Sequence, residues 1–234
     1  MTSSRLPGKV LMPALGHPML HHLVARLRAV PSIDEIVLAT TTNAADDPLV
    51  DFARNENIRV FRGSENDVME RVIGAAEFAG ADVIVEITGD CPIIDPDIVE
   101  QTIRMFKAHD AAYVSNGLIR SYPDGMDTQV FSLEALKRSA AMTRDPLDRE
   151  HVSLFMCKHP ELFPHLNLVA PPSQHWPELG LTLDEPADYE LIKRIIEYFG
   201  EPKPLFSCLD TIRLLHDKPE WVEINRAVKR KGNT

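Results

Sequence analysis

The sequence contains few cysteines and no long apolar segment. Cysteine occurs three times, at Cys91, Cys157 and Cys208, and no two of these residues have CxxC spacing. An odd number without that spacing indicates neither a disulfide framework nor a zinc site, and it fits a reducing compartment. No apolar stretch approaches the ~20 residues of a membrane-spanning helix, and the first residues lack the apolar core of a signal peptide. We therefore expect a cytoplasmic protein without a membrane partner.

Positive charge is also scarce. Lys and Arg number 25 against 35 Asp and Glu, which gives a formal net charge of -10. Nucleic-acid binding depends on many cations that neutralise the phosphate backbone, so nucleic acid is excluded as a principal partner. A single nucleotide can still bind, because a few well-placed cations and one metal ion set the local field. The chain also lacks the Walker-type glycine loop, which excludes P-loop chemistry.

What is present suits one large globular domain. Of the 234 residues, 44% are hydrophobic and 26% are charged, which is enough apolar sequence to bury a core. Apolar runs alternate with segments of helical periodicity, the pattern of an α/β protein with a mostly parallel sheet. We treat residues 1–234 as a single domain, in which residues 117–170 form a meander and helical insert and residues 205–234 form C-terminal helices.

The individual elements follow from these runs. The expected strands are residues 36–41, 58–61, 83–88, 113–116, 127–131, 166–169 and 181–183. The almost continuous apolar run at 83–88 suits a central strand that is buried on both faces. The expected helices begin at capping residues or at Pro, and they span residues 19–27, 49–55, 67–79, 96–106, 132–142, 148–158 and 187–199, with two more between 209 and 229.

A basic loop precedes the first predicted helix. It places Arg5 and Lys9 four residues apart around a Pro-Gly pair, after the hydroxyls of Ser3 and Ser4. Because Gly8 has no Cβ, a phosphate can approach the backbone there. The loop therefore suits a polyphosphate. A loop of this composition can also be solvated surface, and composition alone leaves both interpretations open.

Two carboxylates follow strand-like segments at distant places in the chain. Asp90 lies in Gly-Asp-Cys-Pro after residues 83–88, and Asp184 lies in Leu-Asp-Glu-Pro after residues 181–183. Open α/β sheets bind ligands at the carboxyl ends of their strands. Two carboxylates that meet there could hold Mg²⁺, which takes oxygen ligands and keeps its other positions for water and phosphate oxygens. Either residue could instead cap a helix, the commoner role of Asp before Pro.

Several motifs occur together in the order of one enzyme family. They are Ser-Ser-Arg-Leu-Pro-Gly-Lys-Val-Leu at 3–11, Gly-His-Pro-Met-Leu at 16–20, Ile-Thr-Gly-Asp-Cys-Pro-Ile-Ile-Asp at 87–95 and Thr-Leu-Asp-Glu-Pro at 182–186. Shorter matches are Phe-Arg-Gly-Ser at 61–64, Tyr-Pro-Asp-Gly at 122–125, Asp-Arg-Glu-His at 148–151 and Asn-Arg at 225–226. In these motifs the chain resembles the cytidylyltransferase family that makes CMP-activated acidic sugars, and within it the branch of spore coat polysaccharide biosynthesis protein F.

The resemblance implies a fold and a set of site residues. The implied fold is a Rossmann-like sheet of the glycosyltransferase-A type, usually in a homodimer, with CTP bound over the strand ends. The motif positions assign the nucleotide to Ser4, Arg5, Gly8, Lys9, Arg71 and Asp90, of which Lys9, Arg5 and Asp90 would be catalytic. They assign Mg²⁺ to Asp90 and Asp184, and the sugar to Tyr122, Asp124, Asp127, Arg149, Glu150 and His151.

Plainer interpretations exist for some of these residues. Arg71 could form a surface ion pair with Asp67, which lies one helical turn earlier, worth ~0.3–0.5 kcal/mol. Residues 122–127 could be only a turn, and Arg149 to His151 only the start of a helix. The sequence alone leaves these alternatives open.

The start of the sequence departs from the family pattern. A parallel α/β fold normally opens with a strand, whereas the loop at residues 2–9 comes first here. In the family a strand that commonly ends in Gln-Ala-Arg-Met precedes the basic loop, and Met1 stands where that Met would. We therefore expect roughly ten residues to be missing upstream and the sheet to lack a central strand. Its neighbours would then lose ladder bonds, at ~1–3 kcal/mol for each buried polar group left unpaired.

The predicted reaction is the transfer of CMP to a sugar, for surface polysaccharide or glycan assembly. A sugar hydroxyl would attack the α-phosphorus of CTP, and pyrophosphate would leave in line. The resemblance implies an acidic sugar of the nonulosonic or ulosonic type, whose carboxylate could pair with Arg120 or Arg149. Two alternatives are a glycosyltransferase, which would usually have Asp-x-Asp where this chain has Asp-Cys-Pro, and a non-catalytic nucleotide-binding protein.

Overall fold

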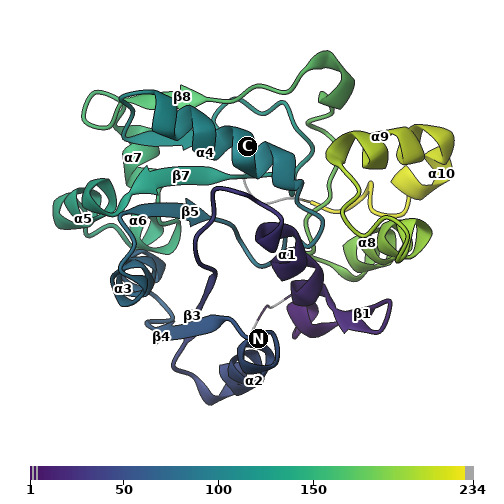
Figure 1. The fold of residues 1–234 in the computed structure, drawn as a ribbon, viewed down its shortest axis with the longest axis horizontal. Coiled ribbons are helices and arrows are strands. Elements are labelled where there is room, and N and C mark those ends of the chain that lie inside the picture. The colour runs from purple at the N-terminus through teal and green to yellow at the C-terminus, as the bar shows by residue number, and fades with distance from the viewer. Residues whose placement is uncertain (2, 4, 230–234) are drawn as a thin grey trace.

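The computed structural model describes residues 1, 3 and 5–229, which form a mixed α/β fold (Figure 1). The strands are β1 (Pro13–Ala14), β2 (His17–Pro18), β3 (Val37–Thr41), β4 (Arg59–Gly63), β5 (Val83–Glu86), β6 (Tyr113–Ser115), β7 (Gln129–Ser132) and β8 (His165–Asn167). The α-helices are α1 (Met19–Arg28), α2 (Asp47–Asn55), α3 (Val68–Ala79), α4 (Pro96–Ala108), α5 (Leu133–Met142), α6 (Pro146–Glu150), α7 (Leu154–Lys158), α8 (Pro186–Phe199), α9 (Cys208–Asp217) and α10 (Pro219–Val222). Short 3-10 helices are η1 (Lys9–Leu11), η2 (Ala44–Asp46) and η3 (Pro172–Gln174). None of the helices in this described part of the chain has the length and apolar character that crossing a membrane requires.

Local capping determines where several helices begin. The side chain of Asp95 accepts a hydrogen bond from the backbone of Asp97 at the start of α4, and Ser132 caps α5 in the same way. Pro occupies the first position of α4 and of α8, where its fixed φ suits a helix and its missing N–H costs nothing. These helix starts, which the sequence predicted, are confirmed.

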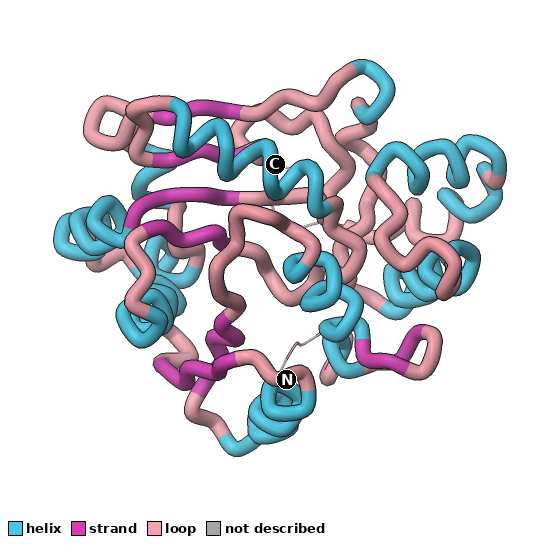
Figure 2. The backbone as a smooth tube through the Cα atoms, viewed as in Figure 1, coloured by secondary structure: helices cyan, strands magenta, loops and turns pink. Residues whose placement is uncertain are grey.

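The strands form separate sheets (Figure 2). Strands β1 and β2 make a hairpin, β3 pairs with β4 in parallel, and the four-stranded sheet has the order β5-β7-β6-β8. In the four-stranded sheet β7 is antiparallel to both β5 and β6, whereas β6 is parallel to β8. Strands β5, β6 and β8 therefore run in one direction and β7 is reversed, which confirms the predicted mixed sheet.

Strand β5 occupies a different position from the one that its sequence predicted. It lies at the end of the four-stranded sheet, and Val83 is 38% exposed. Among residues 1, 3 and 5–229, no ladder joins β5 to β3. The prediction of a central strand was wrong because an apolar run reports burial of side chains and carries no information on which strands pair with it.

Helices cover both faces of the four-stranded sheet. Val130 of β7 packs with Val99 and Ile103 of α4, whereas the next residue, Phe131, packs on the other side with residues of α3 and α5. Neighbouring side chains of a strand point to opposite faces, so β7 is buried between two helical layers. A third apolar cluster lies between α8, α9 and the loop that carries Tyr122.

Two further sequence expectations were wrong in detail. Residues 148–158 form two short helices, α6 and α7, because the chain turns between them at Val152, whose φ is 42°. A β-branched residue rarely adopts this left-handed conformation, so periodicity alone did not reveal the turn. Residues 181–183 form no strand, although the backbone N–H of Leu181 donates to the carbonyl of Asp124 at 2.7 Å.

A buried arginine ties α1 to the C-terminal part of the chain. Arg26 is 1% exposed, and its guanidinium donates hydrogen bonds to the carbonyls of Ile94 (3.2 Å), Phe206 (2.9 Å) and Pro204 (3.1 Å). Its Cζ also lies 4.0 Å from the centre of the Phe206 ring. Burial lowers the pKa of Arg26 to about 10, so the side chain stays charged at neutral pH. This guanidinium connects segments that lie about 180 residues apart.

A carboxyl at the end of β5 has an unusual acidity. Oε2 of Glu86 is buried without a hydrogen-bond partner among the described residues. Burial raises the pKa of Glu86 to about 8, from an ordinary value of 4.5, because the charged form is poorly solvated there. The folded chain therefore keeps a proton that the unfolded chain loses between these two pH values. Stability contributed by this group must fall as the pH rises through that window.

Replacing Glu86 with Gln is expected to flatten this pH dependence. Glu86→Gln should gain stability relative to the wild type as the pH rises from 5 to 8, by up to ~1.4 kcal/mol for each pH unit, because Gln has no charge to bury. Urea unfolding at pH 5, 6, 7 and 8 measures the difference. The exposed Glu178 gives a matched control, Glu178→Gln, which should follow the wild type at every pH. Equal pH profiles for Glu86→Gln and wild type would show that the carboxyl is solvated.

Candidate active site

The basic loop leads directly into a 3-10 helix. Gly8 precedes η1 with φ 70°, a left-handed conformation that a residue with a Cβ rarely adopts, and its N–H donates to the carbonyl of Met1 at 3.2 Å. This turn lets both Arg5 and Lys9 reach the same place. Ser4 lies outside the described residues, so its predicted contact with the nucleotide stays a prediction.

Backbone hydrogen bonding brings the two predicted acids together. Asp90 follows β5 in a turn, in which the N–H of Cys91 donates to the carbonyl of Thr88 at 3.2 Å. Asp184 comes just before α8, and the N–H of the preceding Leu183 donates to the carbonyl of Asp90 at 2.8 Å. The segment that was predicted as a strand therefore runs beside Asp90. That single bond joins positions more than 90 residues apart in the chain.

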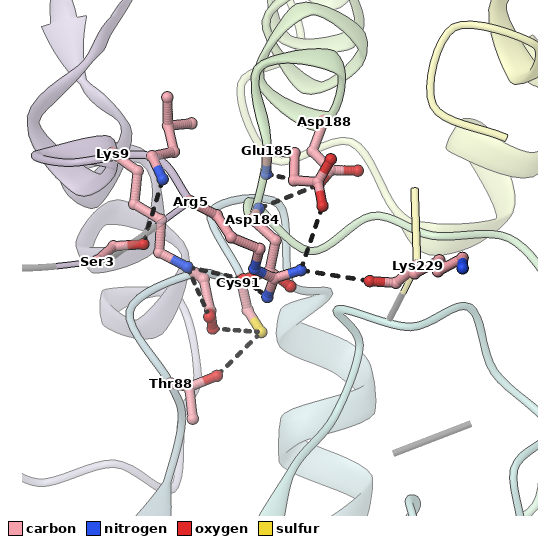
Figure 3. A network of polar contacts seen from close by, with 11 residues as sticks. Ser3, Arg5, Lys9, Thr88, Cys91, Asp184, Glu185, Asp188 and Lys229 are labelled. Carbon is pink, nitrogen blue, oxygen red and sulfur yellow. Dashed lines mark hydrogen bonds and ion pairs between the residues drawn. The ribbon is translucent and has the colours of Figure 1, made fainter. Parts of the chain in front are cut away.

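Lys9 lies between the carboxylates of Asp90 and Asp184; Figure 3 shows Lys9 beside Asp184 and Arg5. Its Nζ is 3.0 Å from Oδ2 of Asp90 and 3.0 Å from Oδ1 of Asp184. Arg5 adds a second cation, with Nη2 2.9 Å from the same oxygen of Asp184 and Nη1 3.6 Å from Oε1 of Glu185. One ammonium group therefore bridges the two aspartates, because an oxygen of each lies 3.0 Å from the same nitrogen. The predicted meeting of Arg5, Lys9, Asp90 and Asp184 is what the structure shows.

The charge of Lys9 depends on these partners. Burial by itself lowers the pKa of Lys9, but the nearby charge of Asp90 and the hydrogen bond to Asp184 outweigh burial and raise the pKa above its ordinary value of 10.5. The side chain of Lys9 is only 14% exposed, and that of Asp184 is 18% exposed. A partly buried ammonium is therefore held in its charged form by two carboxylates.

The same two carboxylates fit a divalent cation. The part of the chain that the structure describes contains no cluster of three or more His, Cys, Asp or Glu side chains that could hold a metal ion. Mg²⁺ does not need such a cage, because it is usually bound through one or two carboxylates and completes its shell with water and phosphate oxygens. In this structure the ammonium of Lys9 supplies the positive charge between Asp90 and Asp184. A divalent cation bound there would supply positive charge to the same two carboxylates.

The loop at residues 122–127 packs against the segment that leads to Asp184. Tyr122 is 6% exposed and belongs to an apolar cluster, and burial raises the pKa of its hydroxyl. A Cβ at Gly125 would lie 2.7 Å from the backbone of Leu181, so the close approach requires glycine. Asp127 accepts a hydrogen bond from the N–H of Gly125 at 3.0 Å. Tyr122, Asp124 and Asp127 therefore have structural contacts, and their predicted contact with sugar stays a prediction.

Arg149 forms ion pairs with two acidic side chains at the N-terminus of α3. Its Nη2 is 2.6 Å from Oδ2 of Asp67 and 3.3 Å from Oε2 of Glu70. Asp67 also caps α3. The ion pairs of the described residues do not include the alternative surface pair between Asp67 and Arg71. Arg71 instead donates to the carbonyl of Ser64 at 2.5 Å, and its Nε is buried without a hydrogen-bond partner among residues 1, 3 and 5–229. Glu150 and His151 are exposed.

Sequence reasoning missed several residues that surround the site. Glu185 contacts Arg5, and the carbonyl of Lys229 accepts a hydrogen bond from Arg5 Nη1 at 3.3 Å. Asp188 accepts hydrogen bonds from the N–H groups of Asp184 and Glu185. The spacing of Glu185 and Asp188 is that of a capping box, and this was a readable signal. No local signal pointed to Lys229, because its contact lies more than 220 residues away in the chain.

Comparisons with known proteins show which family the chain resembles. The family model for cytidylyltransferases matches residues 1–207. The spore coat polysaccharide biosynthesis protein SpsF of Bacillus subtilis is 34% identical over 94% of this chain and 92% of its own length. An 8-amino-3,8-dideoxy-manno-octulosonate cytidylyltransferase of Shewanella amazonensis is 30% identical over 47% of this chain and 46% of its own.

Solved structures show the same fold. A cytidylyltransferase from Leptospira borgpetersenii superposes with a TM-score of 0.91 at 30% identity, covering 98% of this chain and 95% of that one. A CMP:2-keto-3-deoxy-manno-octonic acid synthetase complexed with CTP gives a TM-score of 0.59 at 17% identity, over 84% and 94% of the two chains, which supports the fold alone. Because the family model matches residues 1–207 and the relative from Bacillus subtilis is 34% identical over 94% of the chain, the chain belongs to the cytidylyltransferase family.

Proposed function

We propose that the protein transfers CMP from CTP to a sugar hydroxyl with release of pyrophosphate, in surface polysaccharide or glycan biosynthesis. Membership of the family supports nucleotidyltransferase activity. The observation that carries the proposal is the position of the Lys9 ammonium, at 3.0 Å from both Asp90 and Asp184. Two acids and two cations at the end of one strand provide the charges that a nucleoside triphosphate and its metal ion require.

The residues of the site would divide this work. Arg5 and Lys9 would bind the triphosphate and hold the pyrophosphate as it leaves, because both are cations on one loop. Asp90 and Asp184 would hold Mg²⁺, which when bound neutralises phosphate charge and acidifies the attacking hydroxyl. Lys9 and the metal ion would compete for the same two carboxylates. Binding of the nucleotide would then draw Lys9 away from Asp90 and Asp184 and onto phosphate.

The sugar is proposed to be acidic, of the nonulosonic or ulosonic type. The relative from Shewanella amazonensis carries such a sugar acid, 8-amino-3,8-dideoxy-manno-octulosonate, in its name. Arg149 already pairs with Asp67 and Glu70. Of the two candidate partners for a sugar carboxylate, the exposed Arg120 is therefore the better one. We propose a homodimer as the working assembly on the same family grounds.

Pyrophosphate release tests the proposed function. The purified chain would be incubated with CTP, Mg²⁺ and a panel of acidic and neutral sugars, and CMP-sugar would be identified by chromatography. Sugar-dependent release of pyrophosphate with CTP, and little with ATP, GTP or UTP, is the expected result. Binding of CTP without turnover on any sugar would indicate a non-catalytic nucleotide-binding protein. Consumption of a supplied CMP-sugar would indicate a glycosyltransferase.

A further inference from the structure

A buried carboxylate lies directly behind Asp184. Asp188, in the first turn of α8, is 0% exposed. Its Oδ2 accepts hydrogen bonds from the backbone N–H of Asp184 at 3.1 Å and from that of Glu185 at 2.9 Å (Figure 3). The second of these bonds belongs to a capping box and serves the helix. The first is additional, and it fixes the peptide from which the Asp184 side chain extends toward Lys9 and Arg5.

The C-terminal segment binds the other oxygen of Asp188. Nδ2 of Asn225, which is 5% exposed, donates to Oδ1 of Asp188 at 2.8 Å. The same nitrogen donates to the carbonyl of Gly180 at 2.9 Å. Gly180 precedes the segment that runs beside Asp90 and ends at Asp184. One amide group therefore holds the start of this segment and, through Asp188, also its end.

The contact also connects the end of the described chain with the site. Asn225 follows α10, and four residues later the carbonyl of Lys229 accepts a hydrogen bond from Arg5. Asp188 is fully buried, and inside a protein each hydrogen bond to a carboxylate is worth more than in water. Loss of the Asn225 amide would remove one of these bonds and weaken the hold on the Asp188 carboxyl that accepts from the N–H of Asp184.

We propose that Asn225, acting through Asp188, is a positioning residue that sets how tightly Asp90 and Asp184 bind a divalent cation. The proposal rests on the proposed function, because it assumes that these two acids hold the metal ion. Groups behind a metal ligand orient it, and their mutation typically weakens metal binding by about 10–100-fold. A purely structural role for Asn225 would lower stability and leave the metal affinity of the folded protein unchanged.

Manganese binding tests this role without any turnover. Mn²⁺ replaces Mg²⁺ as a probe, and its free concentration is measured by electron paramagnetic resonance during titration of the full chain. We expect Asn225→Ala to bind Mn²⁺ about tenfold more weakly than the wild type. The matched control is Arg226→Ala, the next residue, whose exposed side chain pairs with Glu223 and which should bind Mn²⁺ like the wild type.

The possible outcomes separate the two proposals. Wild-type affinity in folded Asn225→Ala would overturn the positioning role and leave the proposed function standing. Failure of the wild type itself to bind Mn²⁺ would overturn the assignment of the metal ion to Asp90 and Asp184, and with it the positioning role, whereas CMP transfer is tested separately by pyrophosphate release. Thermal unfolding reports whether each variant is folded at the titration temperature. If Asn225→Ala does not fold, Asn225→Ser takes its place, because its smaller polar side chain cannot span the distance to both Asp188 and Gly180.

Discussion

Replacing Lys9 with Ala is expected to lower the rate of pyrophosphate release from CTP by about 10²–10³-fold. The reason is the position of the ammonium, which the structure places between Asp90 and Asp184 at 3.0 Å from each. A cation at this position can stabilise the negative charge that develops on the leaving pyrophosphate. Steady-state release of pyrophosphate in the presence of Mg²⁺ and the accepted sugar measures the effect.

The same substitution should act on metal binding in the opposite direction. Because Lys9 and a divalent cation compete for Asp90 and Asp184, Lys9→Ala should bind Mn²⁺ at least as tightly as the wild type, although its rate falls. Lys193→Ala is the matched control, since Lys193 is a partly exposed lysine that pairs with Glu197 on α8. A Lys9→Ala variant that keeps the full wild-type rate would remove this residue from the mechanism.

Replacing Arg26 with Met is expected to cause the largest loss of stability. Two buried carbonyls, those of Ile94 and Phe206, and the carbonyl of the exposed Pro204 would each lose a hydrogen bond from the guanidinium. An unpaired buried carbonyl costs ~1–3 kcal/mol, so a total loss of at least about 2 kcal/mol is expected. For a chain of this size such a loss corresponds to a fall in Tm of roughly 4–8 °C. Calorimetry or thermal unfolding followed by circular dichroism measures it.

A second arginine on α1 provides the control for Arg26. Arg28 lies two residues later, its side chain is 44% exposed, and it pairs with Glu56 at 3.0 Å. Because an exposed ion pair is typically worth ~0–1 kcal/mol, Arg28→Met should shift Tm by only a few degrees. Comparable shifts in the two variants would show that burial of Arg26 contributes little to stability.

The helices were the most predictable part of the fold, because their signals are local. Asp95 followed by Pro96 predicted the start of α4, and Ser132 predicted the start of α5; the structure confirms both. Capping bonds join residues two or three positions apart, so they can be recognised from the sequence without knowledge of the rest of the chain. The turn at Val152 was missed for the complementary reason. Its unusual φ occurs where the chain turns from α6 into α7, and a Val carries no local signal for it.

The site was predictable in its members and unpredictable in its surroundings. The motifs that contain Arg5, Lys9, Asp90 and Asp184 marked these residues, and strand ends are where α/β proteins place ligands. The partner of Arg149 and the C-terminal partner of Asp188 were not predictable. Arg149 meets Asp67 from 82 positions away, and Asn225 meets Asp188 from 37 positions away. No periodicity or spacing encodes such pairings, because they depend on how separate elements pack together.

By itself the sequence determined the class of fold, the starts of the helices and the charged residues that the site would use. Only the tertiary structure decided that β5 is an edge strand of the four-stranded sheet and that the buried Arg26 packs against the Phe206 ring. It also decided that the Lys9 ammonium lies between Asp90 and Asp184. The physical reason is the range of the interactions. Capping and periodicity act within a few residues, whereas strand pairing, burial and ion pairing join residues that approach one another only when the chain is folded.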